Sequence, residues 1–158
     1  MARAGLDACV VSSSGNVQYA TGVNSVSSDP SHAIGEPTLA IVTQEEVRVF
    51  VSYPEGVPPE FPVSQVCGPL LVEFPEGAVE LAGHLGDLLG RGPVRVGFDD
   101  LTGAEVVTLT TALPSMEMVD ASIVLAPAKF VKSTDEIECI RGAQARNEIA
   151  NVRRPVVP

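Results

Sequence analysis

The chain has 158 residues and a net charge of −10, with 45 % hydrophobic and 19 % charged residues. This length suffices for one domain with a sizeable buried core, and the composition is that of a globular protein. The acidic balance argues against nucleic-acid and anionic-membrane partners, because phosphate neutralisation needs clustered Lys and Arg. Aromatic residues make up only 4 % of the chain, so we expect an aliphatic core.

The three cysteines, Cys9, Cys67 and Cys139, are odd in number and widely spaced. This pattern predicts neither a disulfide framework nor a zinc site, and it suits a reducing compartment. We find no hydrophobic segment typical of a signal peptide, and no apolar run reaches the length of a membrane span. The sequence therefore favours a cytoplasmic protein with no membrane partner.

Short apolar runs bounded by turn-forming residues predict the strands, two of which flank Gln44–Glu46 as a hairpin. Residues 13–16 are predicted to turn the chain, and residues 23–35 to form a long surface loop. The predicted strands are residues 7–12, 38–43, 47–53, 64–67, 94–98 and 116–120.

Helices are predicted between these strands from apolar spacing and capping patterns. Residues 76–89 place apolar side chains on one face and end before Gly90. Thr102 and Glu105 form a possible capping box that opens a second helix, although the β-branched run that follows would also suit a strand. Residues 122–126 form a helical turn. Alternation of this kind predicts an α/β domain with a mixed sheet covered by helices.

The last predicted helix has the clearest start. Ser133 and Glu136 form a capping box, and acidic residues in the first turn complement the helix dipole. Ile137 and Ile140 predict an apolar stripe, continued by Ala143 and weakly by Ala145 and Ile149. A helix with such a stripe is expected to pack on another part of a protein.

Residues 130–143 resemble the helix that joins the N-terminal domain to the catalytic domain in the creatinase/prolidase/aminopeptidase P family of M24-type metallopeptidases. The Lys132-Ser133, Glu136-Ile137 and Arg141 positions match, whereas Phe130 stands where arginine is usual. Four other segments are similar, in the right order, to strand and turn patterns of the family. These segments are residues 5–11, 16–22, 35–42 and 96–99.

The resemblance implies a domain organisation and a function. It implies a ribonuclease-H-like N-terminal domain over residues 1–132, a joining helix over 133–150 and a tail over 151–158. Such a domain would be the non-catalytic part of an Xaa-Pro dipeptidase-like or creatinase-like metallohydrolase, with a role in dimerisation and in shaping substrate access. The catalytic part would hold two divalent metal ions of the Mn or Co type in a peptidase, and none in a creatinase-like enzyme.

Candidate catalytic residues are few in this sequence. The metal ligands of the family lie beyond the joining helix, so the resemblance gives no residue here a catalytic or metal-binding role. His32 and His84 lack metal-ligand spacing. Asp99 and Asp100 are expected to end a strand and help to cap the following helix, and Cys9 to be an inert buried thiol.

The remaining site residues are expected to be structural or to follow from the resemblance. Asn16, Tyr19 and Gly22 are predicted to build a structural turn. By analogy with the family, Asp29 and His32 are candidates for a substrate-facing loop, with a solvated surface loop as the alternative. Two other functions stay open, a free-standing interaction module and an independent small-molecule-binding α/β enzyme. The joining helix contributes Ser133, Glu136, Ile137, Ile140 and Arg141.

Overall fold

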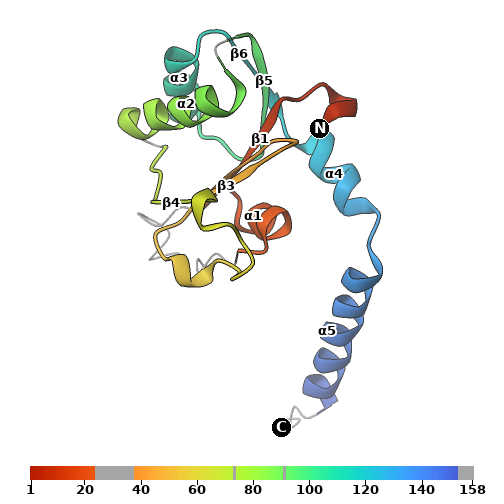
Figure 1. Ribbon diagram of the computed structural model, residues 1–158. Coiled ribbons are helices and arrows are strands. Elements are labelled where there is room, and N and C mark those ends of the chain that lie inside the picture. The colour runs from red at the N-terminus through yellow and green to blue at the C-terminus, as the bar shows by residue number, and fades with distance from the viewer. Residues whose placement is uncertain (24–37, 73, 91, 153–158) are drawn as a thin grey trace, which may run out of the picture. The chain divides into compact units, whose positions relative to one another are not determined.

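A computed structural model describes residues 1–23, 38–72, 74–90 and 92–152. The chain divides into two units, residues 1–125 and 126–158, and each is described by itself. The first unit is built around a six-stranded sheet (Figure 1). Its strands are β1 Ala8–Val11, β2 Leu39–Val42, β3 Val47–Phe50, β4 Val66–Cys67, β5 Val94–Phe98 and β6 Met116–Asp120. The helices of the chain are α1 Ser14–Thr21, α2 Pro75–Leu89, α3 Gly103–Ala112, α4 Ser122–Phe130 and α5 Thr134–Val152, with short 3-10 helices at Ala2–Ala4, Pro54–Gly56 and Val63–Gln65.

The sheet is mixed, as the alternation of elements predicts. Its strand order is β4-β3-β2-β1-β5-β6. Strand β2 runs antiparallel to both of its neighbours, and the other neighbouring pairs are parallel. Residue Val10 of the central strand β1 lies opposite Ile41 on one side and Phe98 on the other. The predicted α/β class is therefore confirmed.

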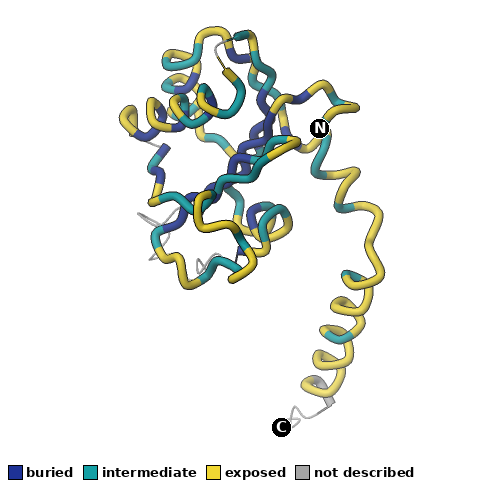
Figure 2. The backbone as a smooth tube through the Cα atoms, viewed as in Figure 1, coloured by how far each residue is buried: buried dark blue, intermediate teal, exposed yellow. Residues whose placement is uncertain are grey.

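Hydrophobic residues cover both faces of the sheet, and the central strand β1 is buried throughout (Figure 2). One face packs against α2 and α3, through residues such as Leu81, Leu85 and Leu109. The other face packs against α1, through Val17. Side chains alternate between the faces of a strand, so the continuous apolar run of β1 serves both layers.

Helix α2 begins unusually close to the segment that precedes it. A Cβ atom added to Gly77 would lie 1.9 Å from the carbonyl oxygen of Leu71. The same carbonyl oxygen accepts a hydrogen bond from the amide of Phe74 at 3.1 Å. The lack of a side chain at Gly77 thus lets the first turn of α2 lie against the backbone of the preceding turn.

The prediction of a turn over residues 13–16 is wrong, because these residues open helix α1. Ser13 precedes the helix, and Gly22 ends it in the left-handed conformation with φ 74°. Val17 is fully buried against the sheet. The Ser, Gly and Asn residues of this segment favour turns. Burial of Val17 nevertheless stabilises the segment as a helix.

Helix α3 is a helix and not a strand, in agreement with its capping box. The Glu105 amide lies 3.3 Å from Thr102 Oγ1, and the Thr102 amide lies 2.6 Å from Glu105 Oε2. Three threonines of this helix donate their hydroxyl hydrogens to carbonyls of the preceding turn. Threonine is β-branched and favours strands, but these bonds satisfy its hydroxyl group within a helix.

The second unit contains α5, which departs from the prediction in two respects. Its apolar residues do not form a continuous stripe, because Ile137 and Ile140 share one side of the helix whereas Ile149 lies on another. Their exposed fractions are 38 %, 54 % and 55 %. The helix also runs to Val152, two residues beyond the predicted end at 150. The expected packing stripe is therefore wrong, although the helix itself is present.

Candidate functional site

A polar cluster surrounds the carboxylate of Asp99, where the parallel strands β1 and β5 end. The amide of Ser12 donates to Asp99 Oδ1 at 2.8 Å. The hydroxyl of Ser13 and the side-chain amide of Asn16 each donate to Asp99 Oδ2 at 2.7 Å. Asp99 also accepts a longer bond, of 3.3 Å, from the Ser13 amide. One carboxylate thus gathers donors from the segment that leads into α1.

This cluster has the chemistry of a helix cap supplied from a distant part of the chain. A carboxylate near a helix N-terminus satisfies free donors and interacts favourably with the helix dipole. The expectation that Asp99 caps the following helix is wrong, because α3 is capped by Thr102. The local sequence gave no signal for this cluster, because Asp99 follows Ser12 by 87 residues.

Among the residues that the structure describes, the Asp99 cluster does not have the arrangement of a nucleophilic site. Activation of a serine hydroxyl needs a base that is itself oriented by a third group, most often a histidine. His84, the histidine that the structure describes, lies instead on α2, where its ring meets the ring of Phe50 edge to face with the ring centroids 4.8 Å apart. The Ser13 hydroxyl therefore serves to hold Asp99 in place.

His84 belongs to a second polar cluster, between α2 and β3. Arg48 Nε donates to Glu46 Oε1 at 2.8 Å, and Arg48 Nη1 lies 3.4 Å from His84 Nδ1. Glu80 Oε1 lies 3.9 Å from His84 Nε2. The His84 ring thus has the basic Arg48 near one nitrogen and the acidic Glu80 near the other. Because the ring also packs against the buried Phe50, we interpret this cluster as packing contacts at the edge of the core.

The described residues hold no group of three or more His, Cys, Asp or Glu placed to bind a metal ion. The cysteines are all free. Cys9 is buried, and burial is the main cause that raises the pKa of its thiol. Burial likewise raises the pKa of the Cys67 thiol. A thiol with a raised pKa is a weak nucleophile, and the burial of Cys9 agrees with the prediction.

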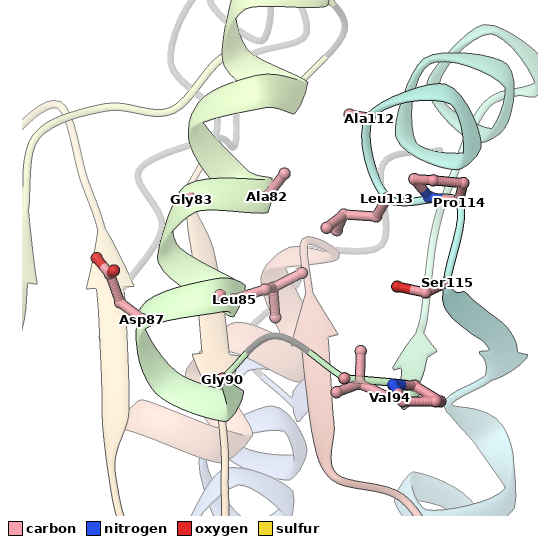
Figure 3. A pocket seen from close by; sticks show the side chains of 13 residues that line it. Ala82, Gly83, Leu85, Asp87, Gly90, Val94, Ala112, Leu113, Pro114 and Ser115 are labelled. Atoms are coloured by element: carbon pink, nitrogen blue, oxygen red, sulfur yellow. The ribbon is translucent and has the colours of Figure 1, made fainter.

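An open pocket of about 600 Å³ lies between the C-terminal half of α2 and the connection from α3 to β6. Leu85, Leu113 and Val94 form its apolar wall, and Ser115 lies at its side (Figure 3). The Asp87 side chain extends away from the pocket. The wall thus offers apolar contact but few polar groups that could orient a ligand, in contrast to a typical small-molecule site.

The start of α5 has the geometry that its sequence predicts. The amide of Ser133 donates to Glu136 Oε2 at 2.7 Å, and the Glu136 amide donates to Ser133 Oγ at 3.2 Å. The bond from Ser133 is the main cause that lowers the pKa of Glu136. Phe130 and Val131, just before this cap, have exposed fractions of 87 % and 76 %. The predicted capping box is therefore confirmed.

The other predicted site residues lie on α1, on α5 and outside the described part of the chain. Asn16 and Tyr19 lie on α1, and Gly22 ends that helix. The Asn16 side chain is one of the donors to Asp99. Asp29 and His32 lie outside the described residues. Arg141 lies on the exposed α5 with Ile137 and Ile140.

The mixed sheet with helices on both faces defines an α/β domain. The chain belongs to the creatinase/prolidase N-terminal domain family, whose model matches residues 1–131. The family resemblance seen in the sequence is thereby confirmed. No curated protein matches the chain.

Solved structures with this fold include a proline dipeptidase, a prolidase and a dipeptidase. A proline dipeptidase from Streptococcus pneumoniae TIGR4 is 21 % identical, with a TM-score of 0.57 over 83 % of this chain and 92 % of that one. A prolidase from Thermococcus sibiricus is 17 % identical, with a TM-score of 0.64 over 87 % of this chain and 36 % of that one. The dipeptidase PepE from Mycobacterium ulcerans is 18 % identical, with a TM-score of 0.62 over 99 % of this chain and 41 % of that one. This chain thus spans less than half the length of the last two.

In the described part of the chain, no helix combines the length and the apolar character that crossing a membrane would require.

Proposed function

We propose that this chain acts as the non-catalytic N-terminal part of an Xaa-Pro dipeptidase-like or creatinase-like metallohydrolase, where it supports dimerisation and shapes the access of substrate. The observation that carries the proposal is α5, a capped helix that follows the family domain without an apolar stripe. A helix that is polar on all sides is typical of a connection through solvent between domains. Phe130 and Val131, which precede α5, are exposed and offer apolar contact to the domain that α5 joins in the proposed parent protein.

The lengths of the similar structures support the same proposal. This chain covers 36 % of the Thermococcus sibiricus prolidase and 41 % of PepE, so those proteins carry much additional chain. In the proposed parent protein the joining helix spans residues 133–150, and the catalytic metal ions are bound beyond it. These would be two divalent ions of the Mn or Co type for a peptidase, and none for a creatinase-like enzyme.

The proposal also assigns a place to residues outside the described part. Asp29 and His32 would lie on a loop that faces the substrate cleft of a homodimer. The free cysteines agree with a reducing compartment such as the cytoplasm. In this assignment the first unit supports the loop, and the loop contributes to substrate specificity.

Hydrolysis of a Gly-Pro dipeptide with added Mn²⁺ or Co²⁺ tests the proposal. The assay compares this 158-residue chain with any longer product of the same gene. We expect the longer product to hydrolyse the dipeptide and this chain to be inactive, since its described residues offer no metal-binding group. In the longer product, Asp29→Asn and His32→Ala should raise KM and leave kcat unchanged, because in this proposal both residues would bind substrate away from the metals.

Two outcomes would contradict the proposal in different ways. Hydrolysis by the 158-residue chain alone would mean that it contains a catalytic site of its own. A gene that ends at Pro158 would leave the free-standing interaction module as the function. If a longer product is inactive on Gly-Pro, creatine is the next substrate to test, because a creatinase-like parent would cleave a related C–N bond.

A further inference from the structure

Helices α2 and α3 contact each other on one face of the sheet, and the open pocket of about 600 Å³ forms a groove where they meet. Its wall on α2 consists of the small residues Ala82, Gly83 and Gly86, and Ala112 and Leu113 form its wall at the end of α3. A Cβ atom added to Gly83 or Gly86 would have no atom within 4 Å. The groove is therefore open to a side chain of another molecule.

The acidic residues of the two helices lie away from this groove or are already bonded. Glu76, Glu80 and Asp87 share one side of α2, because they are spaced by four and seven residues. The Asp87 side chain extends away from the groove (Figure 3). On α3 the acidic residue is Glu105, whose carboxylate accepts the amide of Thr102 in the capping box. The two helices thus turn an uncharged surface to the groove in a chain of net charge −10.

Exposed apolar side chains accompany the groove on both helices. Val79 precedes Gly83 by one turn of α2 and is 62 % exposed. Val107 on α3 is 66 % exposed. The neighbouring hydroxyls of Thr108 and Thr111 donate to carbonyls of the preceding turn, so they are satisfied within the helix. The outer surface of α3 therefore offers apolar contact at little cost in polar groups.

We propose that α2 and α3 form the contact surface between two copies of this chain, in which Val107 of each copy lies in the groove of the other. A two-fold contact uses the same surface on both copies, and this surface carries both a groove and an exposed side chain to fill it. Two copies of net charge −10 repel each other, so contact is favoured where like charges do not meet. The inference rests on the dimerisation in the proposed function, for which it names the surface, and does not depend on hydrolysis.

Sedimentation velocity of the full chain over a wide range of concentrations tests the proposal. The reference chain carries Ile137→Ser and Ile140→Ser, which removes association through these exposed residues of α5. We expect the reference chain to dimerise. Adding Val107→Asp should raise the Kd of the dimer at least about tenfold, because the dimer would bury two unpaired carboxylates in an apolar groove.

The matched control is Val63→Asp, which adds the same charge at a residue that is 87 % exposed on the 3-10 helix Val63–Gln65. This variant should leave the Kd as in the reference chain. Backbone amide signals in NMR spectra, recorded on dilution, locate the contact independently, and those of α2 and α3 should shift.

Three results would overturn the proposal. The reference chain could stay monomeric at all concentrations, which would leave this surface to another partner. Val107→Asp and Val63→Asp could change the Kd equally, which would mean that only net charge matters. The dilution shifts could lie outside α2 and α3, which would place the contact elsewhere. Hydrolysis of Gly-Pro by a longer product enters none of these measurements, so the two proposals fail separately.

Discussion

Replacing Gly77 by alanine tests the close approach at the start of α2. The new methyl carbon would lie 1.9 Å from the carbonyl oxygen of Leu71 and 2.5 Å from its carbonyl carbon. These are backbone atoms, so the clash cannot be relieved by rotation of a side chain. We take about 3 kcal/mol, the upper end of the usual cost of overpacking. The higher helix propensity of alanine offsets about 1 kcal/mol. The free energy of unfolding should therefore fall by about 2 kcal/mol.

Urea denaturation followed by far-UV circular dichroism measures this change, since the chain has no tryptophan. In a thermal scan the same loss would lower the Tm by about 4–8 °C. Gly83→Ala and Gly86→Ala are matched controls in the same helix, because no atom lies within 4 Å of their added carbons. Both should stabilise the protein by about 0.5–1 kcal/mol. If Gly77→Ala stabilises the protein as the controls do, the described contact with Leu71 is wrong.

Three further predictions concern the Asp99 cluster and α5. Asp99→Ala should lower the free energy of unfolding by about 2 kcal/mol in urea denaturation, because it leaves several donors without their acceptor; a loss below about 0.5 kcal/mol would contradict the capping role. The pKa of Glu136 is lowered, so its charged form stabilises the folded helix at pH values above the ordinary 4.5, and this contribution is lost as the pH falls through the lowered pKa. The Ser133 amide signal in an NMR titration should follow this protonation. In Ser133→Ala the midpoint should move only slightly toward the ordinary value, because the backbone amide that is the main cause of the shift is kept. The exposed Ile137 and Ile140 should promote self-association of this chain, so that changing both to serine lowers the mass measured by light scattering at high concentration; a wild type that stays monomeric throughout would refute this.

The elements that the sequence predicts best are those whose signals are local. Strands β5 and β6 were predicted with their observed ends, since each is a short apolar or alternating run between turn residues. The capping boxes at Thr102 and Ser133 lie within three residues of their partners. Such patterns need no knowledge of the rest of the fold.

The elements that the sequence misses depend on distant contacts. Helix α1 is held by the burial of Val17 and by the Asp99 carboxylate, which follows Ser13 by 86 residues. Composition alone favours a turn there, and tertiary contacts override it. The stripe expected on α5 failed for another reason, because Ile149 was counted with Ile137 and Ile140 although it lies on a different side of the helix.

The pairing of β1 also bears on how the chain folds. This strand is made first during synthesis, but one of its two partners is β5, with Ala8 opposite Val96. The hairpin of β2 and β3 joins residues close in sequence, Val42 opposite Val47, and its loop closes at little entropic cost. Parallel pairing between distant segments is slow, because the entropy of closing a long loop is lost before the contacts form. One edge of β1 therefore stays unpaired during synthesis until β5, and with it most of the first unit, has left the ribosome.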